Sequence, residues 1–275
     1  MISGNIEGAY VGKMYSYWVH LYSAMPLEAL DEDCRTHIPK MRKQGHNFLG
    51  DLCCSVWQSV LNLLGKSDNT YVLTGDVMDE DVFLKKPFKH SIALRKSFMF
   101  VYFGEWELGA EDALERGDSY TKAFVGAGYG FEPFYRGICL YAMARKTGLS
   151  KFKKPAQKVR GQLQEWTKKG CVNLVPLVYL LDAEAAILSN KKKKAELLFK
   201  EATKSAAEGG FHQNAGLACE RHALYLMESG DHKEAIAKLA DASNHYSRWG
   251  ATKKVELLQR QIQDLKNDKR KSSPF

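Results

Sequence analysis

The sequence predicts an all-α fold, a solenoid of helical hairpins that repeats about every 40 residues. Apolar residues recur with helical rather than alternating spacing through almost the whole chain. Gly130, Gly170, Gly210 and Gly250 are 40 residues apart, and each follows one helical stretch and precedes another. Only 7 prolines in 275 residues leave room for long uninterrupted helices. Two helices per fixed period indicate hairpins that bury their apolar faces against their neighbours.

The N-terminal part follows this period less strictly. The expected helices cover residues 5–24, 27–44, 46–64, 89–103, 106–116 and 119–126. Pro39 is expected to break or kink the second of them, because proline removes a backbone donor and crowds the preceding turn. The stretch from Gly65 to Pro87 has no long apolar stripe, so a loop or short irregular insertion is expected there. Its acidic residues are Asp76, Asp79, Glu80 and Asp81.

The C-terminal half contains the clearest amphipathic patterns. Single apolar stripes predict helices at residues 193–208, 233–249 and 251–266. Residues 174–188 are apolar on most faces, which predicts a central, buried helix. Pro176 suits the first turn of that helix, where a missing N–H costs little. The weaker breaks inside the hairpins are Thr147-Gly148, Ser189-Asn190 and Gly230-Asp231.

These patterns divide the chain into four segments. We expect N-terminal helical hairpins at residues 1–65, an irregular acidic loop at 66–88, helical repeats at 89–268 and a basic disordered tail at 269–275. The tail is expected to be disordered because it is short, charged and without an apolar stripe.

Charge is unevenly distributed between the two halves of the chain. Residues 1–150 carry 16 Lys and Arg against 18 Asp and Glu, and residues 151–275 carry 24 against 14, a net charge of +10. A basic half is compatible with nucleic acid, acidic lipid or an acidic partner, and equally with solvated lysine-rich loops, which we favour. Nucleic-acid binding would gain support if five cations converged on one face: Lys153, Lys158, Arg160, Lys168 and Lys192.

Composition and motifs place few constraints on chemistry. The longest apolar stretches, Phe98–Phe103 and Leu174–Leu181, are too short to span a bilayer, and the N-terminus does not resemble a secretory signal. Six cysteines without a CxxC motif predict buried, reduced thiols and a cytoplasmic protein. Gly65-Lys66-Ser67 resembles the end of a phosphate-binding loop but lacks the earlier glycine and a preceding strand, so neither ATP nor GTP is expected to bind there. We expect no enzyme activity, catalytic residue, cofactor or metal ion, and His222 is expected to be a core residue.

Residues 216–249 (GLACERHALYLMESGDHKEAIAKLADASNHYSRW) resemble a tetratricopeptide repeat. Small residues stand where that repeat brings its helices close together, and Gly230-Asp231 forms the turn. Residues 176–209 match at the same offsets. The corresponding residues are Ala183, Ala195, Phe199 and Ala202 in one unit and Ala223, Ala235, Leu239 and Ala242 in the other. Because the usual unit is about 34 residues long, the helices here should be longer or the turns looser.

A narrower resemblance covers about residues 130–258. It comprises FEPFYRGICLYAMA, AELLFKEATKSAAEGGFHQNAGLACERHALYLMESG and YSRWGATKKVELL, and residues 5–30 look like earlier hairpins of the same kind. This series is similar to the helical region of large hybrid signalling proteins, which combine an AAA-type ATPase, a sensor histidine kinase and often a Ser/Thr-kinase-like domain. The most specific piece joins Tyr246, Trp249, Gly250, Ala251, Lys254 and Val255.

The resemblance implies a right-handed superhelical solenoid of tetratricopeptide-like hairpins that acts as a non-catalytic scaffold in signalling. Its partner would be a protein or peptide, including the kinase or ATPase modules of a parent protein. The first helices of such repeats line a concave groove, here with Leu177, Leu180, Glu184, Glu220, Leu224 and Met227. Glu184 and Glu220 would either meet cations of the partner or pair internally, for example with Arg221, and we favour internal pairing. The alternatives are a fragment or relative of a multidomain signalling ATPase or histidine kinase and, less favoured, a nucleic-acid-binding repeat.

The first helix is apolar around most of its circumference. An end helix of a solenoid needs a polar outer face, so a preceding segment, a partner or a second copy should cover this one. We therefore expect self-association through this helix, with exposed rings among Tyr10, Tyr15, Tyr17, Trp18 and Tyr22. Helix 251–266 was expected to meet the same need with polar residues, Lys253 and Lys254 among them.

Overall fold

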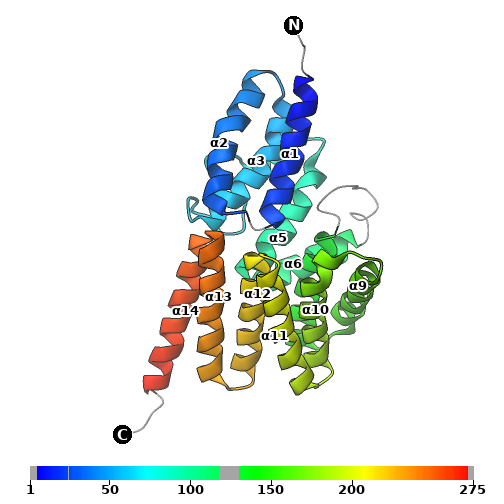
Figure 1. Cartoon of the computed structure of the whole chain (residues 1–275), viewed down its shortest axis with the longest axis vertical. Helices are drawn as coiled ribbons and strands as arrows, with labels where there is room; N and C mark the ends of the chain where they lie inside the picture. The colour runs from blue at the N-terminus through cyan, green and yellow to red at the C-terminus, as the bar shows by residue number, and fades with distance from the viewer. Residues whose placement is uncertain (1–4, 24, 118–129, 272–275) are drawn as a thin grey trace. The chain divides into compact units, whose positions relative to one another are not determined.

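A computed structural model describes residues 5–23, 25–117 and 130–271, with side chains up to residue 267 (Figure 1). Within these ranges all regular secondary structure is helical, which confirms the all-α prediction. The chain forms two compact units, Met1–Cys139 and Leu140–Phe275, and their boundary falls inside α8 (Glu132–Thr147). No helix in the described part of the chain is both long enough and apolar enough to cross a membrane.

Three long helices begin the first unit: α1 (Ile6–Tyr22), α2 (Leu27–Lys43) and α3 (Asn47–Leu63). α3 lies at the centre of the unit, because nearly every residue from Leu49 to Leu63 is buried. α1 and α2 pack against it and against each other. α2 runs through Pro39 without interruption, so the predicted break is absent.

The second part of this unit contains α5 (Ala93–Phe103) and α6 (Trp106–Arg116). α5 packs against both α3 and α6, so residues 89–116 belong with the N-terminal hairpins rather than with the later repeats. The unit boundary therefore differs from the divisions expected at residues 65 and 88. The helix expected at 119–126 lies outside the described residues.

Residues 66–88 form an irregular segment that is held against α3 and α5. The Asn62 side chain donates to the carbonyl groups of Thr70 and Val72 at 3.0 and 2.8 Å. Glu80 begins the one-turn helix α4 (Glu80–Phe83) and forms an ion pair with Lys96 of α5 at 2.8 Å. The irregular insertion is confirmed, and at least one of its acidic residues has a structural partner.

The aromatic residues of α1 differ in exposure. Exposed rings are expected among five residues, and Tyr15 is such a ring, whereas Tyr17, Trp18 and Tyr22 are buried. Tyr22 packs edge-on against Phe98 of α5, with ring centroids 5.5 Å apart. The exposed fraction of Tyr15 is 41%, and Tyr10 is half-buried. Self-association through α1 stays a prediction.

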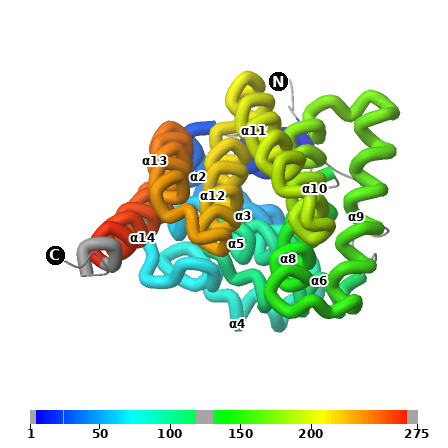
Figure 2. Tube along the Cα trace, turned by 90° about the horizontal axis from the view of Figure 1, so that it is seen from below, coloured from blue at the N-terminus to red at the C-terminus, as the bar shows by residue number. Residues whose placement is uncertain are grey.

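The second unit continues α8 and adds six long helices in chain order. They are α9 (Ser150–Lys168), α10 (Val175–Leu188), α11 (Lys192–Glu208), α12 (His212–Glu228), α13 (His232–Trp249) and α14 (Thr252–Lys271). From α9 onward each helix packs against the next one in the chain, as Figures 1 and 2 show. The central, buried helix expected at 174–188 is α10, and Pro176 lies in its first turn.

The helix ends of the second unit lie at the predicted breaks. A left-handed backbone conformation ends the helices, because a residue without a Cβ atom adopts it at little cost. The residues with positive φ angles are Gly148, Gly170, Asn190, Gly210, Gly230 and Gly250. The 40-residue glycine spacing therefore marks helix ends at Gly170, Gly210 and Gly250.

The buried faces of α11 and α13 are the predicted stripes. In α11 the buried residues are Ala195, Leu198, Phe199, Ala202 and Ala206, and in α13 they are Ala235, Leu239, Ala242, Tyr246 and Trp249. Helical spacing by itself was enough to find them, because each helix contacts neighbours on one side and water on the other.

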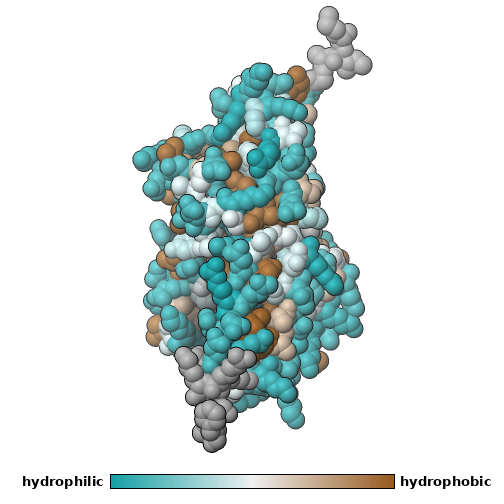
Figure 3. All heavy atoms as spheres, turned by 90° about the vertical axis from the view of Figure 1, so that its left-hand side faces the viewer, coloured by the Kyte–Doolittle hydropathy of each residue, from teal (hydrophilic) through white to brown (hydrophobic). Residues whose placement is uncertain are grey.

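The last helix differs from its prediction in two respects. α14 extends to Lys271, so residues 269–271 are helical rather than part of a disordered tail. Lys254, expected on the outer polar face, is buried. Figure 3 looks onto the side of the second unit that carries α14 and shows mainly hydrophilic side chains with apolar ones between them.

We expect Ala235→Leu to lower the free energy of unfolding by about 1–3 kcal/mol, because a buried small residue leaves no room for three more carbons. Ala235 has no exposed surface. Thermal or urea unfolding of this variant should be compared with Ala240→Leu, which adds the same atoms at an exposed position of the same helix. Equal stability of the two variants would contradict the close packing of α13.

Candidate functional site

The six residues predicted to line a groove differ in accessibility. Leu177, Leu180 and Glu184 are buried, and the exposed fraction of Glu220 is 8%. These four side chains offer almost no surface to a partner. Leu224 and Met227 of α12 are half-buried and remain accessible.

Glu184 lies at the centre of a buried ionic cluster in the second unit. Its two carboxylate oxygens accept hydrogen bonds from Arg221 Nε at 2.7 Å and from Arg145 Nη1 at 2.8 Å. Arg145 also donates to Glu228, whose side chain is 60% exposed. The cluster joins α8, α10 and α12, so internal pairing of Glu184 with Arg221 is confirmed.

The two arginines control the protonation of Glu184. Burial alone would raise the pKa of this carboxyl group, because a low dielectric disfavours charge. Arg221 and Arg145 outweigh burial and lower the pKa to about 2. Glu184 is therefore a carboxylate at neutral pH, and neither of its oxygens is free for acid–base chemistry.

Glu220 forms a second ionic cluster, with partners that the sequence analysis did not name. It accepts hydrogen bonds from Tyr246 of α13 at 2.8 Å and from Lys254 of α14 at 2.7 Å. Internal pairing is correct for Glu220 as well, but the partner is not Arg221. The ammonium group of Lys254 also lies 5.3 Å from the centre of the Tyr246 ring.

This cluster explains the motif that begins at Tyr246. Trp249 and Ala251 have no exposed surface, and Gly250 turns the chain with a φ angle of 89°. The chain turns at Gly250, and Lys254 in the first turn of α14 bonds Glu220 of α12. Tyr246, Trp249, Gly250, Ala251 and Lys254 thus have structural roles in this part of the unit.

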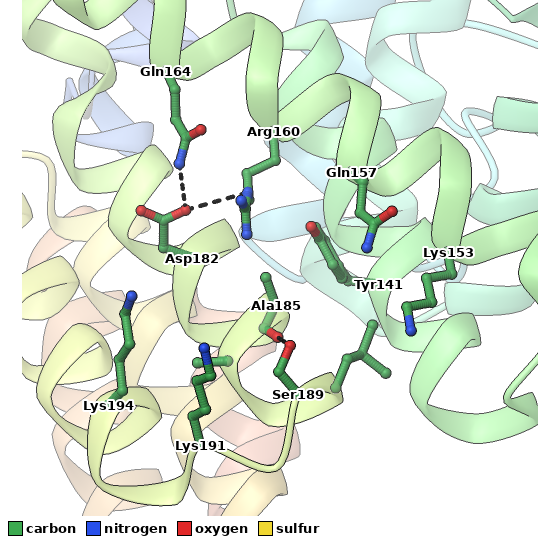
Figure 4. Close-up of a pocket in the computed structure, with 12 residues that line it drawn as sticks. Tyr141, Lys153, Gln157, Arg160, Gln164, Asp182, Ala185, Ser189, Lys191 and Lys194 are labelled. Carbon is green, nitrogen blue, oxygen red and sulfur yellow. Dashed lines mark hydrogen bonds and ion pairs between the residues drawn. The ribbon is translucent and has the colours of Figure 1, made fainter.

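A basic pocket lies between α9, α10 and α11 (Figure 4). Its volume is about 320 Å³. The polar and charged lining residues are Tyr141, Lys153, Gln157, Arg160, Gln164, Asp182, Ser189, Lys191 and Lys194. Lys153, Gln157, Arg160 and Gln164 follow helical spacing, so they share one face of α9. Lys153 and Arg160 stand out in the sequence as cations, but their proximity to α11 is not apparent from it.

At one side of this pocket, Asp182 is paired with two other lining residues. Asp182 of α10 accepts a hydrogen bond from Gln164 at 2.8 Å, and Arg160 Nε lies 3.4 Å from the same oxygen. Burial raises the pKa of Asp182 despite these partners. The remaining cations of the pocket, Lys153, Lys191 and Lys194, have no carboxylate of the described residues within ion-pair distance.

Of the five cations proposed as a nucleic-acid face, Lys153 and Arg160 line the basic pocket, whereas Lys158, Lys168 and Lys192 do not. Lys168 pairs with Glu165 on the surface. Nucleic-acid binding stays a less favoured alternative.

Two other sequence features have structural explanations. Gly65-Lys66-Ser67 follows the helix α3 rather than a strand, and Lys66 forms an ion pair with Asp31 at 2.7 Å. His222 is buried and stacks on Phe199, with ring centroids 4.8 Å apart. Burial, together with Lys238 and Lys200, lowers the pKa of His222 to about 4, as expected for a neutral core histidine.

The sequence predicted buried, reduced thiols, and most of the cysteines are of this kind. All six cysteines are free. Five are buried, and Cys171, just before α10, is the exposed exception.

No protein family, curated protein or solved structure matches this chain. The resemblance to tetratricopeptide repeats and to hybrid signalling proteins therefore stays a prediction.

Proposed function

We propose that the chain is a non-catalytic scaffold, a solenoid of tetratricopeptide-like hairpins that binds another protein or another module of a signalling assembly. The observation that carries this proposal is the packing of α9 to α14, each helix against its successor in the chain. Hairpins stacked in this way present a long surface whose residues can vary without loss of the core.

The interior of the second unit also favours a structural role. Its two buried carboxylates, Glu184 and Glu220, are each held by two internal donors. Carboxylates neutralised in this way stabilise one arrangement of helices. A side chain that acts as a general acid or base needs a pKa suited to proton transfer, and it must face a substrate.

Leu224 and Met227 are the accessible part of the proposed groove. They lie three residues apart on α12, so they share one face of that helix. A helix or extended peptide of the partner would pack on them as apolar anchors. The four buried residues of the predicted groove would support this surface from beneath rather than touch the partner.

The test is binding to partners recovered from the source cells with the tagged full chain, followed by reconstitution with each purified partner. Replacing Leu224 and Met227 together by Gln should weaken the reconstituted complex at least tenfold, because loss of two central apolar contacts of about 1 kcal/mol each corresponds to about thirtyfold. Leu197→Gln is the matched control, since Leu197 is 58% exposed on α11 and lies outside the groove.

Circular dichroism should show that all variants fold. If wild type and the Leu224/Met227 variant bind every reconstituted partner with equal affinity, this surface is not the binding site. Failure to reconstitute any partner would contradict the scaffold function itself.

A further inference from the structure

The basic pocket between α9, α10 and α11 carries an uncompensated positive charge. Four cations line it against the single carboxylate of Asp182, which is already paired with Arg160 and Gln164. The second unit as a whole has 26 Lys and Arg against 14 Asp and Glu, so no surrounding excess of acid offsets the pocket. An anion entering it would meet a favourable potential.

The start of α11 adds to this potential. The residue before the helix is Lys191, which provides no side-chain cap, and the first turn contains no acidic residue. Lysines at a helix N-terminus are unfavourable, because the free N–H groups already make that end positive. Four consecutive lysines there, Lys191 to Lys194, lower the stability of the free helix and would be compensated by a bound anion.

The opposite wall of the pocket is also polar. Tyr141 of α8 is one of the lining residues, and its side chain is buried. Its hydroxyl group lies beside the Arg160 guanidinium, which is its hydrogen-bond partner. Figure 4 shows Tyr141 and Arg160 on one side of the space, with Lys191 and Lys194 on the side of α11.

We propose that this pocket binds an anion of the phosphate class that carries two or more negative charges. Lys191, Lys194 and the first turn of α11 would hold one side of the anion, and Lys153 and Gln157 would donate hydrogen bonds from the other. Asp182 positions Arg160 and is neutralised by it. The volume of about 320 Å³ is at the small end of ligand pockets and suits one or two phosphoryl groups with a short attachment.

Isothermal titration of the full chain with inorganic pyrophosphate at low ionic strength tests this directly. Replacing Lys191 and Lys194 together by Gln should weaken pyrophosphate binding about 10- to 100-fold, as expected for the loss of charge-assisted hydrogen bonds. The matched control replaces Lys192 and Lys193 by Gln. It removes the same charge from the same turn, but neither residue lines the pocket, so its effect should stay within about threefold.

Thermal unfolding gives a second readout. Pyrophosphate at about ten times its dissociation constant should raise the melting temperature of wild type by roughly 3–6 °C. Without ligand, the Lys191/Lys194 variant should melt at the wild-type temperature or above it, because an unfavourable charge at the helix start has been removed. Loss of binding together with unchanged or higher stability separates a ligand site from a structural one.

The source of the phosphoryl group is distinguished by further probes. Inorganic phosphate, pyrophosphate and a phosphoserine peptide are titrated in parallel, and the tightest of them identifies a free or a peptide-borne anion. The proposal is overturned if none binds wild type, or if the two double-lysine variants lose affinity equally. It is also overturned if only single-stranded RNA binds, with equal losses in both variants, since that would show diffuse contact with a nucleic-acid backbone.

Discussion

Glu184→Gln is expected to lower the free energy of unfolding by about 3–5 kcal/mol, the cost of breaking a buried ion pair by removing one partner. Glu184 has no exposed surface and bonds both Arg145 and Arg221. The neutral amide would remove the buried countercharge that both guanidinium groups share, and Arg145 would keep its ion pair with the exposed Glu228. Urea unfolding, followed by circular dichroism, measures the effect.

Glu228→Gln is the matched control for this prediction. It removes a carboxylate from the same cluster, but the Glu228 side chain is 60% exposed, so the loss should be at most about 1 kcal/mol. Equal losses for the two variants would show that burial does not determine the strength of this cluster.

The same cluster predicts a specific acid response. The folded-state pKa of Glu184 is about 2, below its unfolded value of 4.5, so its contribution is fully present above pH 4.5 and is lost as pH falls towards 2. A difference of this size corresponds to about 3 kcal/mol. Between pH 4.5 and 2, wild type should therefore lose more stability than Glu184→Gln. Parallel pH dependence of the two proteins would contradict the ionised, arginine-bound state.

Trp249→Ala should cost about 3–5 kcal/mol, because removal of a fully buried indole leaves a cavity in addition to the lost burial. Trp249 is among the largest side chains without exposed surface, and it ends α13 where Gly250 turns the chain into α14. The variant should lose both stability and the docking of α14. Hydrogen exchange should then increase throughout α14 and only slightly in α10.

Trp166→Ala provides the comparison, since Trp166 is half-buried near the end of α9. Its cost should be clearly smaller. A loss for Trp249→Ala no greater than that for Trp166→Ala would mean that the motif from Tyr246 to Lys254 does not hold the last helix in place.

The helices of this protein could be predicted closely from the sequence. The stripes of α11 and α13, the turns at Gly210 and Gly250, and the central position of α10 all follow from interactions within a few residues. Helical spacing of apolar residues indicates which face of a helix is buried, and glycine indicates where the backbone adopts a left-handed conformation. α2 is the exception, because its packing against α3 is compatible with Pro39 inside the helix.

The candidate sites could be predicted only in part. The presence of Glu184 and Glu220 in apolar helices indicated that each needed a cation, since a lone buried charge is too costly. Arg221 could be named as a partner of Glu184, but Arg145 and Lys254 could not be assigned, because Arg145 is 39 residues from Glu184 and Lys254 is 34 residues from Glu220. The pocket of α9 and α11 was missed for the same reason: it unites side chains that come together only when α10 packs between their helices.

Sequence alone thus determined the class of fold, the approximate positions of most long helices and the residues of most buried stripes, because these depend on local periodicity and turn chemistry. Tertiary structure decided the division at α8, the burial of the aromatic rings of α1, the partners of the buried carboxylates and the convergence of Tyr141 with Lys191 and Lys194. The physical reason is that a charge or a ring is satisfied by whichever group the packing brings within a few ångströms, and sequence separation does not encode that distance.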